Sequence, residues 1–316
     1  MLIDGIVLGG YAIEPSPDRL PGGQEQWYGL LDGIPGAGGV EVPFRGGALH
    51  PEGPQRLLQL LPAGWSVIVT MVPATMAGIG ANDGYGLASP DDAGREAALA
   101  DVRGALDAAA VLADAAGRDV VAAIHVTSAP RGAAGDGDRL AASLAELAPR
   151  ARGVLLSVEH CDAWRPDGEV QKGFLSLDAE IAAVTAAREA TGAAIGQTIN
   201  WGRSVIDERD VAGGVAQLDR LAAAGTLAGL MVSGVSASGS ATRAPWADAH
   251  NAIDTVDPSS SLTAGVLAEL LAPHRRAELA YLGVKVTDPH DSADPPDRIA
   301  PLAATVEAVR RAEAAA

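Results

Sequence analysis

The sequence has very few residues able to crosslink the chain or to bind metals through sulfur, and few aromatic rings. One of its 316 residues is a cysteine, Cys161, and only 3% are aromatic. A lone thiol excludes an internal disulfide and a zinc site built from cysteines. With so few rings, Ala, Val and Leu must fill the core, and an apolar content of 48% is enough for a large one.

Positive charge is also scarce. The chain has 23 basic and 40 acidic residues, a formal net charge of −17, which argues against nucleic acid or an anionic membrane as partner. No apolar run approaches the roughly 18 residues of a membrane span, and the N-terminus, MLIDGIVLGGY, lacks the basic start of a secretory signal. We therefore expect a cytoplasmic protein with a small-molecule ligand, for which a homo-oligomer is one option.

The usual glycine motifs of nucleotide-binding proteins are missing. Gly9 and Gly10 follow the first apolar segment, but the next residues, YAIE, complete neither a GxGxxG fingerprint nor a P-loop. The sequence therefore disfavours a dinucleotide-binding fold and the open, doubly wound sheet that accompanies it.

Strand-like and helix-like segments alternate from end to end, with no linker and no change of composition. We predict strands at 3–8, 39–42, 65–72, 120–126, 154–158, 194–199, 227–232 and 279–286, and helices at 24–31, 54–61, 90–116, 139–147, 176–191, 207–225, 261–271 and 298–314. Eight such pairs predict a single (β/α)₈ TIM barrel over residues 1–316. The glycine-rich segments 73–88 and 236–251 are predicted loops, each a candidate to close over a site.

Ionisable residues interrupt or end several of the apolar strands. In a TIM barrel the catalytic groups come from the carboxyl ends of the strands, which makes Glu41, His125, Glu159 and Lys285 the catalytic candidates. A buried carboxylate needs a partner or does chemistry. Lys285 is expected to pair with one of the two glutamates, as a structural ion pair, as a cation for a substrate oxyanion, or as a Schiff-base amine. His125 is either a core histidine or part of the site.

A second group of residues lies near the same strand ends and could bind substrate. Polar side chains would hydrogen-bond a ligand, and the tryptophans could offer a flat surface to a sugar ring or simply pack in loops. His160 directly follows Glu159, so it points to the opposite face of its strand, toward the helices if Glu159 points into the barrel. The substrate-binding candidates are Asn200, Trp201, His160, Arg45, His50, Arg203, Trp246 and His250.

Two short motifs and the eightfold layout resemble the xylose isomerase-like barrel superfamily of sugar isomerases and epimerases, and more narrowly an uncharacterised actinobacterial barrel family. The motifs are VEVPF at residues 40–44 and SVEH at 157–160. The resemblance implies a divalent metal held by acidic and histidine ligands from strands five to eight. Glu159 matches the fifth-strand ligand, but Asn200, Ser233 and Lys285 replace the other three. Because a fixed ammonium repels a metal ion, we favour the absence of a metal cofactor, with Lys285 taking over part of its electrostatic role, and keep a divalent metal as the alternative.

Three functions are compatible with these residues. The first is a sugar or sugar-acid isomerase, epimerase or lyase, in which Glu41 or Glu159 removes a proton beside a carbonyl and Lys285, His125 or Asn200 stabilises the enolate. The second is a glycoside hydrolase that uses the same two glutamates. The third is a barrel that binds a sugar without catalysis.

Overall fold

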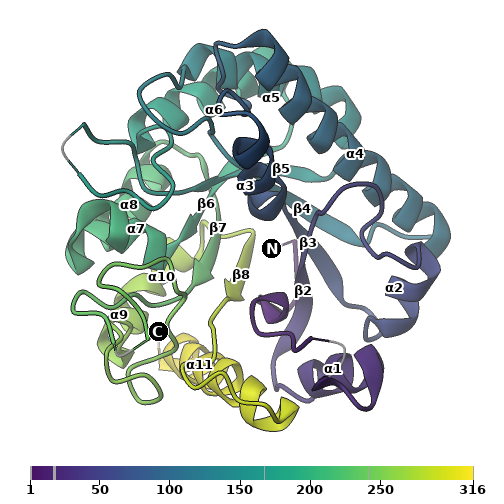
Figure 1. Ribbon diagram of the computed structural model, residues 1–316, viewed down its shortest axis with the longest axis vertical. Helices are drawn as coiled ribbons and strands as arrows, with labels where there is room; N and C mark the ends of the chain where they lie inside the picture. Colours follow the sequence, from purple (N-terminus) through teal and green to yellow (C-terminus); the bar gives the residue numbers. More distant parts are fainter. Residues whose placement is uncertain (1, 17–18, 167, 241, 316) are drawn as a thin grey trace.

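Eight parallel strands close into one barrel in chain order, as predicted (Figure 1). The computed structural model describes residues 2–16, 19–166, 168–240 and 242–315. The strands are short and almost wholly buried, as their apolar sequences require. They are β1 (Ile6–Leu8), β2 (Ala37–Pro43), β3 (Ser66–Thr70), β4 (Val121–Val126), β5 (Leu155–His160), β6 (Ile195–Asn200), β7 (Leu227–Val232) and β8 (Tyr281–Val284).

Helices surround the barrel and bury their apolar faces against it (Figure 1). Several begin at a side chain that accepts a backbone N–H, such as Asp91 before α4 and Ser176 before α6. The elements are the short 3₁₀ helix η1 (Gly10–Ala12), then α1 (Gly23–Asp32), α2 (Pro54–Leu60), α3 (Val72–Ala81), α4 (Asp92–Ala116), α5 (Gly137–Ala151), α6 (Leu177–Thr191), α7 (Trp201–Glu208), α8 (Val211–Ala223), α9 (Ala264–Leu270), α10 (Pro273–Arg276) and α11 (Pro295–Ala315).

Two predicted elements differ from the structure. The segment expected as a loop at 73–88 begins with helix α3, although its sequence is rich in glycine and small residues. The helix expected at 207–225 is α8, capped by Asp210, and a further helix that was not expected, α7, precedes it and ends at Arg209, whose backbone is left-handed with φ 54°. As a result, Trp201 and Arg203 lie in helix α7 and not in a loop.

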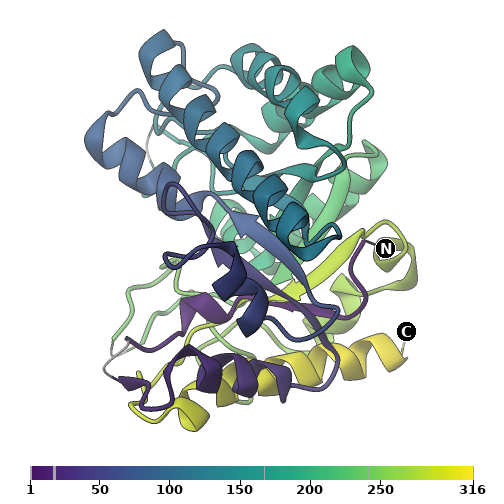
Figure 2. The ribbon, with the colours of Figure 1, turned by 90° about the vertical axis from the view of Figure 1, so that its right-hand side faces the viewer.

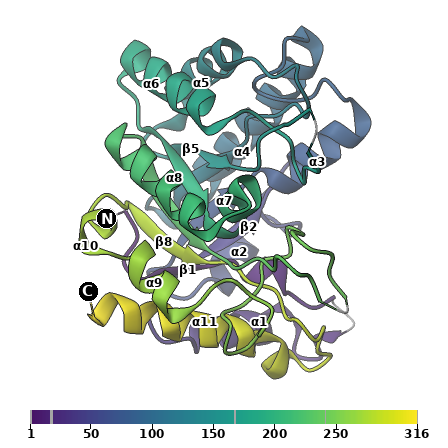
Figure 3. The same ribbon diagram turned by 90° about the vertical axis from the view of Figure 1, so that its left-hand side faces the viewer.

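The barrel has two unlike ends. The chain termini lie together at one end, while the long connection after β7 covers the other (Figures 2 and 3). The barrel interior near the termini is filled by an apolar cluster that includes Ile3, Val7, Ile68 and Leu155. The carboxylates and the ammonium of the barrel strands lie instead toward the carboxyl end. No helix within the described ranges is long and apolar enough to cross a membrane.

Candidate active site

Three predicted catalytic side chains meet inside the carboxyl end of the barrel. Glu41 lies on β2, His125 on β4 and Glu159 on β5, and all three are fully buried. The His125 Nδ1 atom lies 3.7 Å from Glu41 Oε1 and 3.8 Å from Glu159 Oε2. Among the described residues, Glu41 Oε2, Glu159 Oε2 and His125 Nδ1 have no hydrogen-bond partner. Because unpartnered polar atoms are costly to bury, this cluster is arranged for a ligand or for chemistry.

Lys285 pairs with Glu41, one of the two partners that its sequence position suggested. Its Nζ atom donates to Glu41 Oε1 at 3.3 Å and lies 3.2 Å from Oε2, out of line for a second hydrogen bond. The same ammonium sits 4.9 Å from the centroid of the Tyr11 ring, a cation–π contact. Lys285 is buried and directly follows β8, so its charge is fixed at the barrel mouth.

Arg203 forms the corresponding ion pair with Glu159. From helix α7, its Nη1 donates to Glu159 Oε1 at 2.7 Å and its Nε donates to Asp248 Oδ2 at 3.1 Å. Lys172 Nζ donates to the same Asp248 oxygen at 2.9 Å. Each barrel glutamate therefore has its own cation, and Asp248 ties the loop after β7 to the site.

These cations set the protonation states of the site. Burial would raise the pKa of Glu41, but Lys285 and His125 outweigh it and lower the pKa to about 2. Burial is likewise outweighed at Glu159, chiefly by Arg203, so its pKa also lies below the ordinary value. Burial would lower the pKa of Lys285, yet Glu41 holds it above its ordinary range. Both glutamates are thus carboxylates and Lys285 an ammonium, which disfavours the Schiff-base role.

A hydrogen-bonded layer beneath His125 holds its ring. Tyr281 OH lies 2.8 Å from His125 Nε2 and also contacts Thr198 Oγ1, which is 2.6 Å from Ser157 Oγ. Tyr281 begins β8 at the amino end of the barrel, so the rule that sites lie at carboxyl ends overlooks it. Its ring fits because Gly229 has no side chain: a Cβ there would lie 2.2 Å from Tyr281.

Two further predicted residues, Asn200 at the end of β6 and His250 in the loop after β7, meet at the hydroxyl of Ser233 beside the site. Asn200 Oδ1 accepts a hydrogen bond from Ser233 Oγ at 2.6 Å, and His250 Nδ1 lies 3.4 Å from that hydroxyl. Burial lowers the pKa of His250 to about 3, so its ring is neutral. Asn200 Nδ2 has no partner among the described residues. These groups line up beside Arg203 and Asp248 as neutral hydrogen-bonding neighbours.

His160 lies outside the barrel, on the face predicted from its alternation with Glu159. Its Nδ1 donates to Glu180 at 2.7 Å and its Nε2 to Asp207 at 3.3 Å, both from the helix layer. Burial would lower its pKa, but the two carboxylates raise it to about 10. His160 is thus a buried imidazolium that joins β5 to α6 and α7, and its predicted contact with substrate is not supported.

We expect His160→Gln to lower the free energy of unfolding by about 1–3 kcal/mol near neutral pH, because the two carboxylates lose a charged donor. A raised pKa stabilises the fold below the unfolded value of 6.5 and ceases to do so as pH rises through about 10. Denaturant unfolding at pH 6 and pH 10 should therefore show a larger difference between variant and parent at pH 6. An equal difference at both pH values would contradict the assignment.

The two predicted tryptophan platforms do not line the site. Trp201 is fully buried in the hydrophobic core between the strands and helices, beside Gly214 of α8. Trp246 packs on Arg209, whose guanidinium carbon lies 5.0 Å from the ring centroid. Both rings therefore contribute to packing, which was the second of the two roles considered for them from the sequence.

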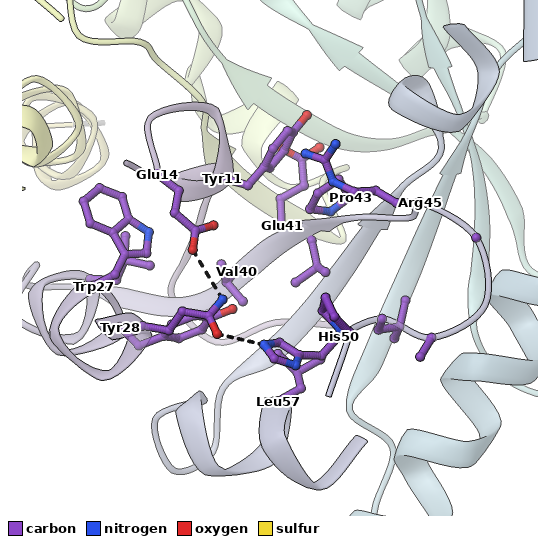
Figure 4. A pocket seen from close by; sticks show the side chains of 17 residues that line it. Tyr11, Glu14, Trp27, Tyr28, Val40, Glu41, Pro43, Arg45, His50 and Leu57 are labelled. Atoms are coloured by element: carbon purple, nitrogen blue, oxygen red, sulfur yellow. Dashed lines mark hydrogen bonds between the residues drawn. The ribbon is translucent and has the colours of Figure 1, made fainter. Parts of the chain in front are cut away.

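Arg45 and His50 lie in a pocket next to the carboxylate cluster. The pocket has a volume of about 480 Å³, and Glu41 and Tyr11 form part of its wall (Figure 4). His50 Nε2 donates to Gln24 Oε1 at 2.9 Å, and Gln24 Nε2 donates to Glu14 at 3.5 Å. Glu41 is fully buried and forms part of the pocket wall, so the pocket lies directly beside the buried cluster.

The metal site implied by the superfamily does not fit these side chains. Of its four positions only Glu159 offers a carboxylate, Asn200 Oδ1 accepts from Ser233, and Lys285 brings an ammonium. A different set, Glu41, His125 and Glu159, could hold a metal, since one donor atom from each lies within 4.8 Å of the others. Lys285 and Arg203 already neutralise those two glutamates.

The chain matches a known family model and one curated protein. The model described as "Domain of unknown function (DUF4862)" matches residues 7–300. An uncharacterised protein of Salmonella typhimurium strain LT2 is 29% identical over 299 residues, which cover 93% of each chain. These matches extend over nearly the whole barrel and carry no assigned activity.

Solved structures of the xylose isomerase-like type share the fold. A putative xylose isomerase from Rhodospirillum rubrum has a TM-score of 0.69, with 14% identity over 98% of this chain and 99% of that one. An L-ribulose 3-epimerase has a TM-score of 0.60, with 16% identity and coverage of 98% and 96%. The IolI protein with a bound zinc atom has a TM-score of 0.61, with 11% identity and coverage of 97% and 98%. The predicted resemblance in fold is confirmed.

Proposed function

This chain belongs to the DUF4862 family, and we propose that it is an enzyme that isomerises, or eliminates water from, a sugar or sugar acid by removing a proton beside a carbonyl. The observation that carries the proposal is the buried pairing of two carboxylates with two fixed cations around His125. Barrels of the same fold include an epimerase that acts on a sugar and a putative sugar isomerase, which supports the substrate class.

Glu159 is the proposed base. Its Oε1 is held by Arg203, while its Oε2 is buried and free to accept a proton. Glu41 instead positions Lys285, whose ammonium would stabilise the negative charge that develops on the carbonyl oxygen. The proton passes from substrate carbon to Glu159, and the C–H electron pair moves into the enolate. A second proton moves from the neighbouring hydroxyl to the former carbonyl oxygen, and return of the first proton to the neighbouring carbon, with formation of the new carbonyl group there, completes isomerisation.

The spacing of the carboxylates favours one base over two. A reacting carbon lies about 3–3.5 Å from each base that attacks it, so two bases on opposite faces need roughly 6–7 Å between them. The donor atoms of Glu41 and Glu159 lie within 4.8 Å of each other. We therefore propose transfer on a single face, as in isomerisation or elimination, in preference to two-base epimerisation.

The glycoside hydrolase alternative receives less support. One oxygen of Glu41 lies within 4.8 Å of one oxygen of Glu159, which is compatible with the roughly 5 Å between the carboxyl groups of retaining enzymes. Such enzymes need one carboxylic acid with a raised pKa to protonate the leaving group, whereas the pKa values of Glu41 and Glu159 are both lowered. Neither glutamate is a proton donor at neutral pH.

The direct test is incubation in D₂O with free sugars, sugar acids and aryl glycosides, followed by proton NMR. We expect deuterium to enter the carbon beside a carbonyl. Release of sugar from a glycoside without exchange would favour the hydrolase. Saturable binding with neither reaction would leave the non-catalytic sugar-binding barrel as the function.

The reaction is expected to need no metal. We expect the purified protein to contain far less than one divalent ion per chain, and exchange to continue in the presence of a chelator, because Lys285 supplies the positive charge at the oxyanion. Elemental analysis and the same NMR assay measure both quantities. One tightly bound ion per chain, with exchange lost on chelation and restored by that ion, would contradict the proposal.

A further inference from the structure

The pocket beside Glu41 carries a charge that the proposed chemistry does not use. One wall presents Tyr11, Glu41 and Arg45, and the other presents the chain of hydrogen bonds from Glu14 through Gln24 to His50 (Figure 4). The space of about 480 Å³ is within the range of small-molecule sites. A ligand with its reacting carbon near the buried cluster would extend its far end into this pocket.

Arg45 differs from the other cations of the site in having no partner. Lys285 and Arg203 each pair with a buried carboxylate. Arg45 is instead exposed, and among the described residues it makes no hydrogen bond and no ion pair. Burial raises the pKa of Glu14, and the positive charge of Arg45 opposes that rise. Glu14 itself accepts a hydrogen bond from Gln24. The guanidinium of Arg45 is therefore exposed in this pocket and available to a ligand.

We propose that the substrate carries an anionic group, a carboxylate or a phosphate, at the end remote from the reacting carbon, and that Arg45 binds this group. The planar guanidinium can donate two parallel hydrogen bonds to either anion. The inference rests on the proposed function, because it assumes that the reaction takes place beside Glu41, which forms part of the wall of this pocket. It narrows the substrate from sugars in general to acidic sugars.

The opposite wall suits the hydroxyl groups of such a ligand. His50 Nδ1 accepts from the backbone N–H of Glu52 at 3.1 Å while its Nε2 donates to Gln24, so the ring is fixed as the neutral tautomer. Burial also lowers its pKa. Glu14, Gln24 and His50 therefore present a preformed row of donors and acceptors, with Arg45 as the charged contact.

Equilibrium binding tests the inference without requiring turnover. We would titrate D-glucuronate, D-glucose 6-phosphate and D-glucose into the full chain by calorimetry at low salt. At least one of the two acids should bind ten times more tightly than glucose or better, and the one that does identifies the anion as carboxylate or phosphate. Added salt should weaken this preference.

Three variants locate the effect. Arg45→Gln should reduce the affinity for the preferred acid at least tenfold and leave that for glucose unchanged, while Arg45→Lys should retain part of it. Arg311→Gln, the same change of charge on the exposed end of α11, should alter nothing. Equal affinities for acids and glucose, no binding of either acid, or an unaffected Arg45→Gln would each overturn the proposal. Failure of the exchange assay alone would overturn the reaction and not the anion site.

Discussion

Glu159→Gln should lower the rate of deuterium exchange by about 10²–10⁴, the usual contribution of a positioned general base. Glutamine has nearly the same shape and can still accept from Arg203 through its amide oxygen, but it cannot take up a proton. The same change at Glu180, a glutamate equally buried but turned toward the helices, should leave exchange by the folded fraction within about threefold, since it contacts no reacting atom.

The pH dependence of the exchange rate is a second test of Glu159 as the base. Burial would raise the pKa of Glu159, but the nearby cations, chiefly Arg203, lower it below the ordinary value. The base therefore stays ionised at mildly acidic pH. The rate of exchange should therefore fall only below the ordinary glutamate pKa of 4.5. An acid limb near pH 6, or a Glu159→Gln variant with undiminished exchange, would show that another group is the base.

Lys285→Met should lower the free energy of unfolding at pH 7 by about 3–5 kcal/mol, because it leaves the carboxylate of Glu41 buried without its cation. A second change, Glu41→Gln, should restore most of that loss, since a neutral amide needs no cation. The Lys285→Met variant and the double variant should both lose deuterium exchange, because neither has the ammonium that stabilises the oxyanion. Denaturant unfolding followed by circular dichroism measures the stabilities, and NMR measures the exchange.

The sign of the pH dependence follows from Glu41. Its pKa is lowered to about 2, so it stabilises the fold above the unfolded value of 4.5 and this stabilisation is lost as pH falls through 2. In Lys285→Met the pKa of Glu41 should rise, so the deficit should shrink as acid protonates the carboxyl. Lys172→Met, at a more exposed pair with Asp248, serves as control and should cost less. A double variant as unstable as Lys285→Met would contradict the pairing.

The fold was predictable because the strands are apolar runs, most of which end in polar residues, and this pattern needs no tertiary information. Helix α3 was missed because its sequence, VPATMAGIGA, has the small residues and glycines typical of loops. Helix α7 was missed as a separate element because the residue that ends it with a left-handed backbone is Arg209 and not a glycine. Both failures arise where packing overrides local preference.

The site was predictable to the extent that it follows strand ends. Glu41, His125, Glu159 and Lys285 come together because parallel strands bring their carboxyl ends to one mouth. The pairing of Lys285 with Glu41, in preference to Glu159, depends on side-chain geometry that the sequence does not contain. Tyr281 could not be predicted as a site residue for a different reason. Its hydroxyl contacts His125 only because Gly229, on the neighbouring strand, has no side chain where the Tyr281 ring lies.

The ion pair between Lys285 and Glu41 constrains how this barrel can change over evolutionary time. Acquiring a glutamate at position 285 in a single step would place a third carboxylate against Glu41 and Glu159 and remove the ammonium that neutralises one of them. That intermediate would carry the cost of uncompensated buried charge. Neutralising Glu41 first would avoid that cost. This one contact therefore favours one order of substitutions, and we expect positions 41 and 285 to covary among relatives.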